Sequence, residues 1–329
     1  MGIKWLLDGH HVYVVSTCKE SRAACIMLCH LLLQTVKNQQ SAGVSPGQPH
    51  LLLYNLAKIK DMEKAVNDLS QAARGGSLYV IADEVSGSRY FRTVCDKLLT
   101  QVPHLHLWAA SCYHGYAPSG WQVEYLTRPL RSPPVVVREV EQDWSMFKGH
   151  VLPYRQRGVP DHTDGPPVRR LYHRGHGHSG DRPGDCVTCG RDVASFLCSL
   201  RVGVTGNVTT TATTVTSTKG ATTPPCLQWR DVLVLYRDKI SADAIYHSGM
   251  MKGLKEASIP VRVMKDNDIE DVATARSDVV WVMDGQRVCS LERKVVVCVE
   301  DYGTARLYSM SRCTSQLVIV YDSNEPKGN

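Results

Sequence analysis

The regular alternation of short β-rich runs with helical patterns constrains the fold of this chain more than any other feature. Up to residue 110, apolar residues between the runs recur at three- and four-residue steps, as they do on one face of a helix. This alternation is typical of a parallel sheet covered by helices. The predicted strands are His11–Ser16, His50–Asn55, Ser77–Ala82 and His104–Ala109, and the predicted helices are Ser21–Val36, Lys60–Ala73 and Ser88–Thr100.

The same alternation returns near the C-terminus. The predicted strands there are Asp231–Tyr236, Pro260–Met264, Val279–Val282, Lys294–Val299 and Gln316–Tyr321, and the predicted helices are Ala242–Ala257 and Thr304–Arg312. A chain of 329 residues is long enough for two domains that each bury a core. We therefore predict an α/β fold with two parallel-sheet lobes, the first over residues 1–127 and the second over residues 227–329.

The segment between the lobes has a different composition. Prolines, glycines and charges are frequent from Arg128 to Asp185, which indicates a connector with one short helix near Val135–Met146. We expect residues 128–200 to form this connector and the start of the second lobe, with a helix over Arg191–Leu200. Thr, Ser and Gly dominate Thr205–Pro225, where too little apolar surface is available to offset the entropy of ordering. Residues 201–226 are therefore predicted to be a disordered insertion.

Composition and charge indicate which partners and which cellular compartment to expect. The net charge of +6 at pH 7 is compatible with a nucleic-acid partner, although the basic residues form no continuous run. Several of the 12 cysteines, such as Cys25, Cys29 and Cys298, lie in apolar runs where buried free thiols are common. No signal peptide is recognisable, and no apolar run reaches the ~18 residues of a membrane span. We expect an intracellular protein without a membrane partner.

Two adjacent carboxylates follow the apolar run Leu78–Ala82. Ligands of open α/β sheets bind beyond the carboxyl ends of the strands, so Asp83 and Glu84 are expected to project into a site. In a P-loop NTPase an Asp at this place holds Mg²⁺, and a following Glu orients and deprotonates the attacking water. The alternative is that both acids cap the next helix, because acidic residues favour helix N-termini.

Other segments offer hydroxyl groups and arginines. Ser16 and Thr17 follow the first predicted strand, where hydroxyls and helix N-terminal amides can hold a single-stranded backbone. Arg128 and Arg131 lie at the entrance to the second lobe and could reach a γ-phosphate, although arginines near prolines are commonly solvated. Arg312 lies where a predicted helix joins a strand, a place from which it could stabilise charge on a transferring phosphoryl group.

In this order along the chain, the segments resemble the motor of superfamily 1 (UvrD-like) helicases, over nearly the whole sequence. The matching segments are His11–Thr17 for motif Ia, Val80–Glu84 for motif II, Leu126–Ser132 for motif IV, Val288–Val297 for motif V and Tyr308–Val320 for motif VI. The resemblance implies two RecA-like lobes that bind ATP with Mg²⁺ between them and single-stranded DNA or RNA across their tops.

The resemblance also implies roles for individual residues. Asp83 would hold Mg²⁺, Glu84 would be the catalytic base, and Arg312 would be the arginine finger. The remaining roles would be contact with the γ-phosphate for Arg131, a nucleotide-site position in motif V for Glu292, and contact with nucleic acid for Ser16 and Thr17.

Some parts of the family pattern are missing from this sequence. The glutamine of motif III is absent from Ala110–Gly115, and Thr314 stands near the place of a second basic residue of motif VI. No Gly-x-x-x-x-Gly-Lys-Ser/Thr occurs in the 329 residues, so the amides and the lysine that grip the β- and γ-phosphates are lacking. We expect a fragment of a helicase-like ATPase that lacks its first strand and P-loop and is inactive alone. The alternative is a non-catalytic regulatory or interaction module derived from the same fold.

A second site is indicated by a cluster of histidines and cysteines in the connector. Cys186 and Cys189 form a Cys-x-x-Cys pair shortly after His176 and His178. Two thiolates and two imidazoles suffice for a closed tetrahedral zinc site. Alternatively, Cys189 only begins the following helix, or the two thiols form a redox pair.

Overall fold

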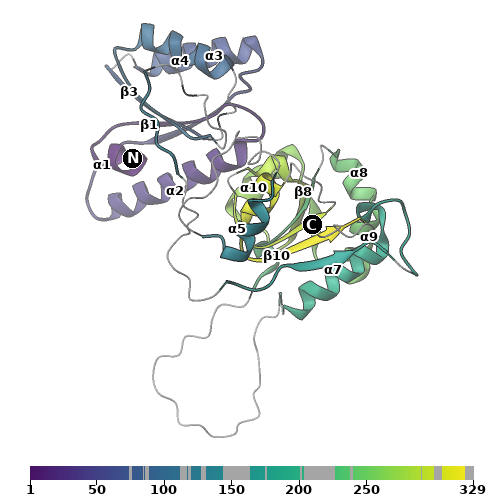
Figure 1. Ribbon diagram of the computed structural model, residues 1–329. Helices are drawn as coiled ribbons and strands as arrows, with labels where there is room; N and C mark the ends of the chain where they lie inside the picture. Colours follow the sequence, from purple (N-terminus) through teal and green to yellow (C-terminus); the bar gives the residue numbers. More distant parts are fainter. Residues whose placement is uncertain are drawn as a thin grey trace, which may run out of the picture.

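The protein contains two separate parallel sheets, each covered by helices on both faces (Figure 1). A computed structural model describes residues 1–73, 76–83, 85, 89–111, 117, 120–126, 131–143, 164–174, 176–200, 202–203, 227–237, 240–289, 291–299 and 306–322. Every strand pairing within them is parallel. The predicted α/β fold class with two parallel-sheet lobes is therefore confirmed.

Lobe one is built on the four-stranded sheet, with strand order β2-β1-β3-β4. Its core has two layers: α1 and α2 cover one face of the sheet, and α3 and α4 cover the other. The elements are α1 (Gly2–Leu7), β1 (Val12–Ser16), α2 (Arg22–Ser41), β2 (Pro49–Leu53), α3 (Ile59–Ala72), β3 (Ser77–Asp83), α4 (Arg89–Gln101) and β4 (His104–Ala109).

Lobe two is built on the six-stranded sheet, with strand order β5-β10-β9-β6-β8-β7. Its strands are β5 (Arg169–Tyr172), β6 (Val232–Tyr236), β7 (Val261–Val263), β8 (Val280–Asp284), β9 (Arg293–Val299) and β10 (Cys313–Tyr321). Its α-helices are α5 (Pro134–Val140), α7 (Val187–Ser199), α8 (Ala242–His247), α9 (Gly249–Glu256), α10 (Ile269–Thr274) and α11 (Arg306–Ser309). The short 3₁₀ turns are η2 (Pro183–Asp185), η3 (Trp229–Asp231), η4 (Asp266–Asp268), η5 (Gly285–Val288) and η6 (Met310–Arg312).

The central strands of lobe two are apolar throughout, which places them between two helical layers. All five residues of β6 and of β8 are buried, as expected for parallel strands covered on both faces. Alternate residues face opposite cores: Val232 and Val234 pack with α7 and α9, whereas Leu233 and Leu235 pack with α5, α10 and α11. Two of the candidate residues lie at the amino ends of neighbouring strands: Glu292 directly precedes β9, and Arg312 directly precedes β10.

Four features of lobe two differ from the predictions. The strand β5 lies within the predicted connector; two of its four residues are arginines, so its apolar pattern is weak, and at the sheet edge it pairs only with β10. The predicted helix Ala242–Ala257 is broken at Ser248, whose hydroxyl accepts the Met251 N–H and caps α9. The helix α10 was not predicted. The predicted helix Thr304–Arg312 is replaced, within the described residues, by α11 and η6.

The lobes contact each other through α2, which packs against α10 and η5 of lobe two. Ala23, in the first turn of α2, lies in the core cluster of lobe two together with Val288 and Leu291. The beginning of α2 therefore belongs to both lobes (Figure 1). Among the described helices, none combines the length and apolar character that crossing a membrane requires.

Candidate functional site

The first group of candidate residues lies at the carboxyl edge of the sheet in lobe one. Ser16, the last residue of β1, pairs in register with Asp83, the last residue of β3. The pKa of the nearby Cys25 thiol is raised to about 12, first by burial and then by the negative charge of Asp83. This interaction places the Asp83 carboxylate close to the first turn of α2. Glu84, the expected catalytic base, lies outside the described residues, as do residues 112–116 of the motif III segment.

Hydrogen bonds of Ser16 and Ser21 stabilise the loop between β1 and α2. Ser16 is completely buried, and its Oγ lies 2.8 Å from Ser21 Oγ and donates to the Cys18 carbonyl at 2.8 Å. Ser21 Oγ in turn accepts the backbone N–H groups of Thr17, at 3.1 Å, and Cys18, at 3.3 Å. The expected contact between Ser16 and nucleic acid remains untested, but its hydroxyl is already engaged in shaping this loop.

Two buried polar atoms, one in the loop between β1 and α2 and one on the first residue of α2, have no hydrogen-bond partner among the described residues. They are Thr17 Oγ1, on a residue that is only 5% exposed, and Arg22 Nε. Buried polar atoms are nearly always paired with protein or water, so each such atom requires an explanation. The sequence analysis selected Thr17 but missed Arg22, the first residue of α2.

The second group of candidates lies in lobe two. Arg131 Nε contacts Glu292 Oε2 at 2.7 Å, which joins the expected motif IV and motif V residues. Ser132 Oγ donates to the Ser311 carbonyl at 3.5 Å, so the residues next to Arg131 and Arg312 are also in contact. Arg312 is buried, and its Nε donates to the Tyr308 carbonyl at 2.9 Å. The structure thus brings three segments that are distant in sequence to one place.

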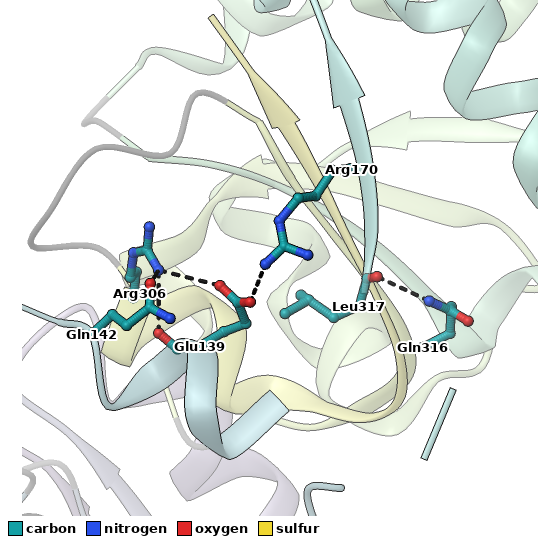
Figure 2. Close-up of polar contacts among 6 residues, drawn as sticks. All are labelled: Glu139, Gln142, Arg170, Arg306, Gln316 and Leu317. Carbon is teal, nitrogen blue, oxygen red and sulfur yellow. Dashed lines mark hydrogen bonds and ion pairs between the residues drawn. The ribbon is translucent and has the colours of Figure 1, made fainter. Parts of the chain in front are cut away.

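A buried carboxylate that the sequence analysis missed helps to position the segment that carries Arg312. Glu139 of α5, with a side chain 8% exposed, lies between the guanidinium groups of Arg170 and Arg306 (Figure 2). Arg306 Nη1 contacts Glu139 Oε2 at 3.3 Å and donates to Gln142 Oε1 at 2.7 Å. Asp143 accepts the Leu307 N–H at 2.9 Å. The end of α5 therefore fixes the start of α11, and α11 leads directly to Arg312.

The sequence contained a partial signal for this cluster. Gln142 and Asp143 lie three and four residues after Glu139, which places them on the same side of a helical segment as Glu139. Their partner, Arg306, lies far along the chain, so the sequence alone does not pair it with them.

A third group consists of sulfur and imidazole atoms in lobe two. One ligand atom from each of His173, His178, Cys186 and Cys189 lies within 4.8 Å of the other three, so that this group could hold a metal ion. His173 directly follows β5, and Cys186 and Cys189 lie at the N-terminal end of α7. His173 and both cysteines are buried, and His178 is partly buried.

The surroundings of this group favour ionised sulfur at one of the two cysteines. Burial raises the pKa of Cys186, but hydrogen bonds from the backbone of Cys189 and Ser179 and from nearby side chains outweigh it, so the pKa falls to about 6. Burial and the neighbouring Cys186 raise the pKa of Cys189. His173 Nε2 lies 3.1 Å from the Gly180 carbonyl, which can accept the Nε2 proton and so leave Nδ1 unprotonated, 3.4 Å from Cys189 Sγ.

The group of potential ligands in the structure differs at one position from the set expected from the sequence. His176 lies on an exposed turn and is not part of the group. The buried His173 takes its place, because the chain that follows β5 folds back over the N-terminus of α7. The expected ligands Cys186, Cys189 and His178 are brought together.

Comparison with known proteins does not assign a family. No protein-family model and no curated protein matches the chain. Among solved structures, the chain is similar to the crystal structure of Arterivirus nonstructural protein 10, a helicase, with 9% sequence identity and a TM-score of 0.29. The match covers 99% of this chain and 62% of that protein, so the chain spans about three-fifths of its length. This TM-score is too low to support a shared fold.

Proposed function

We propose that this chain is a helicase-like protein that binds single-stranded nucleic acid where its two lobes meet. The observation that carries the proposal is the pair of buried, unpartnered polar atoms, Thr17 Oγ1 and Arg22 Nε, at the beginning of α2. Helix N-termini, hydroxyl groups and arginines are the groups with which proteins hold phosphate backbones. The order of helicase-like segments along the sequence supports the same function.

The position of α2 relative to both lobes supports this proposal. The helix begins beside the strand ends that carry Ser16 and Asp83, and its first turn packs into the core of lobe two at Ala23. Val288 and Leu291 of that core belong to the motif V segment Val288–Val297. A strand bound here would contact both lobes, so that a change in their relative position would be transmitted to it.

The residues present do not fit a complete ATP–Mg²⁺ site. Asp83 has suitable chemistry for Mg²⁺ because hard cations prefer carboxylate oxygens. However, the 329 residues contain no Gly-x-x-x-x-Gly-Lys-Ser/Thr segment to hold the triphosphate, and Arg131 is already paired with Glu292. We therefore propose that this chain alone hydrolyses ATP negligibly, and we assign no hydrolytic step to it.

The same missing segment favours the alternative, a non-catalytic regulatory or interaction module derived from the helicase fold. The two proposals differ in whether the chain binds single strands. With fluorescently labelled single-stranded DNA and RNA at about 50 mM salt, the first proposal predicts saturable binding, measured by fluorescence anisotropy, that weakens steeply as salt rises. Failure to bind either strand under these conditions would leave only the interaction module.

A further inference from the structure

The atoms of the His/Cys group are too close together to be explained by hydrogen bonds alone. His178 Nδ1 lies 3.5 Å from Cys186 Sγ and 3.4 Å from Cys189 Sγ. A neutral imidazole has one nitrogen that accepts a single hydrogen bond, so it cannot accept from both thiols. His173 Nδ1 also lies 3.4 Å from Cys189 Sγ. A shared cation at the centre would account for all three distances.

These distances agree with those of a zinc ion. Zinc–sulfur bonds of about 2.3 Å and zinc–nitrogen bonds of about 2.0–2.1 Å at tetrahedral angles give a sulfur–nitrogen separation of about 3.5 Å. Three of the four sulfur–nitrogen distances in the group are 3.4, 3.4 and 3.5 Å. Two thiolates and two neutral imidazoles also balance the two positive charges of the ion, which limits the cost of placing it in a buried site.

The groups around these four residues orient them as ligands. The Gly180 carbonyl can accept a hydrogen bond from His173 Nε2, which leaves the Nδ1 lone pair directed at the centre. Cys186 Sγ accepts the backbone N–H of Cys189 at 3.4 Å, as expected of a thiolate that caps a helix. Four protein ligands leave no open position for water or substrate, which is the pattern of a structural site.

We propose that His173, His178, Cys186 and Cys189 bind one structural Zn²⁺ through the two Nδ1 and two Sγ atoms. Binding releases any proton that the thiols carry to solvent, and no other bond changes. The ion connects the end of β5, where the His173 N–H donates to the Tyr321 carbonyl at 2.9 Å, with the first turn of α7. It thus holds the edge strand of lobe two against the helix that covers it. This proposal does not depend on nucleic-acid binding.

A zinc measurement with matched histidine variants tests the ligand set. The purified full chain, loaded with Zn²⁺ and then dialysed, should retain about one equivalent by elemental mass spectrometry. His173→Ala and Cys189→Ser should lose most of the metal. His176→Ala alters a histidine of the same loop and should retain it, because His176 is exposed and outside the group. Zinc loss in His176→Ala but not in His173→Ala would overturn the proposal.

Two measurements on the unaltered chain keep the test decisive even if the variants do not fold. Replacement of Zn²⁺ by Co²⁺ should give the thiolate charge-transfer and tetrahedral d–d absorption bands of a Co²⁺ site with sulfur ligands. Removal of zinc should also accelerate tryptic cleavage after Arg174, in the loop that the ion closes, but not after Lys97 in lobe one. If the protein takes up no Co²⁺ and shows none of these bands, or if mass spectrometry finds a Cys186–Cys189 disulfide, no zinc site exists.

Discussion

Arg131 and Glu292 form an ion pair with an Nε–Oε2 distance of 2.7 Å, although they lie in segments far apart in the sequence. The pair joins the connector entering lobe two to the loop before β9. The Arg131 side chain is 72% exposed, so the pair lies largely in solvent. Its significance is therefore its position rather than its strength, because exposed ion pairs contribute little to stability.

This exposure leads to a prediction about stability. Arg131→Ala should lower the free energy of unfolding by less than about 1 kcal/mol, and the double-mutant cycle with Glu292→Gln should show coupling of similar size. The coupling should decrease at high salt, where the charges are screened. Chemical denaturation of the four proteins measures it. Coupling of several kcal/mol that is insensitive to salt would show that the pair is buried in solution.

The Glu139 cluster should behave in the opposite way. Glu139→Ala leaves Arg306, whose side chain is only 15% exposed, without its carboxylate and also removes the pair with the more exposed Arg170, which should cost about 3 kcal/mol or more of unfolding free energy. Arg138→Ala on the same helix is the control. It breaks an exposed pair with Asp164 and should cost less than about 1 kcal/mol. Equal losses in the two variants, measured by denaturant titration, would contradict this interpretation.

The substitution Thr17→Val distinguishes a role of this hydroxyl in nucleic-acid binding from a role in stability. Thr17→Val keeps the shape of the side chain and removes a buried hydroxyl that has no partner among the described residues, so stability should be unchanged or slightly higher. If the hydroxyl bonds to nucleic acid, the oligonucleotide Kd should rise about 2- to 10-fold. Thr35→Val, which removes an exposed hydroxyl bonded to the Leu31 carbonyl, should change neither quantity. An unchanged Kd for Thr17→Val would remove Thr17 from the interface.

Arg22 should contribute through its charge. Arg22→Gln should weaken binding of all single-stranded sequences similarly and reduce the slope of log K against log salt by about 1. Lys37→Gln makes the same change in charge on the exposed, distal part of α2 and is the matched control. Anisotropy titrations over a series of salt concentrations measure both slopes. An equal reduction in both variants would indicate a general charge effect rather than a contact.

Apolar patterns predicted most of the two sheets because buried parallel strands are nearly continuous runs of β-branched and aliphatic residues. The runs of β6 and β8 are examples. The strand β5 escaped detection because Arg169 and Arg170 interrupt its pattern at the sheet edge. The break at Ser248 was missed because a capping serine is compatible with the interior of a helical pattern.

The sites were predictable only where their residues are neighbours in sequence. The Cys-x-x-Cys pair and His178 lie in one group of potential metal ligands, but sequence spacing did not show that His173, rather than His176, joins them. That choice depends on how the chain turns after β5. Similarly, Glu139 pairs with Arg306 only because α5 and α11 pack together in the folded lobe.

The proposed nucleic-acid site lies where the first turn of α2 meets lobe two. Hydrogen–deuterium exchange of the full chain, with and without a saturating single-stranded oligonucleotide, tests it most directly. Binding at this place should slow amide exchange in residues 16–25 and in the segment around η5, because a bound backbone would cover both. Slower exchange confined to other parts of the protein, while these segments remain unchanged in a saturated complex, would contradict it.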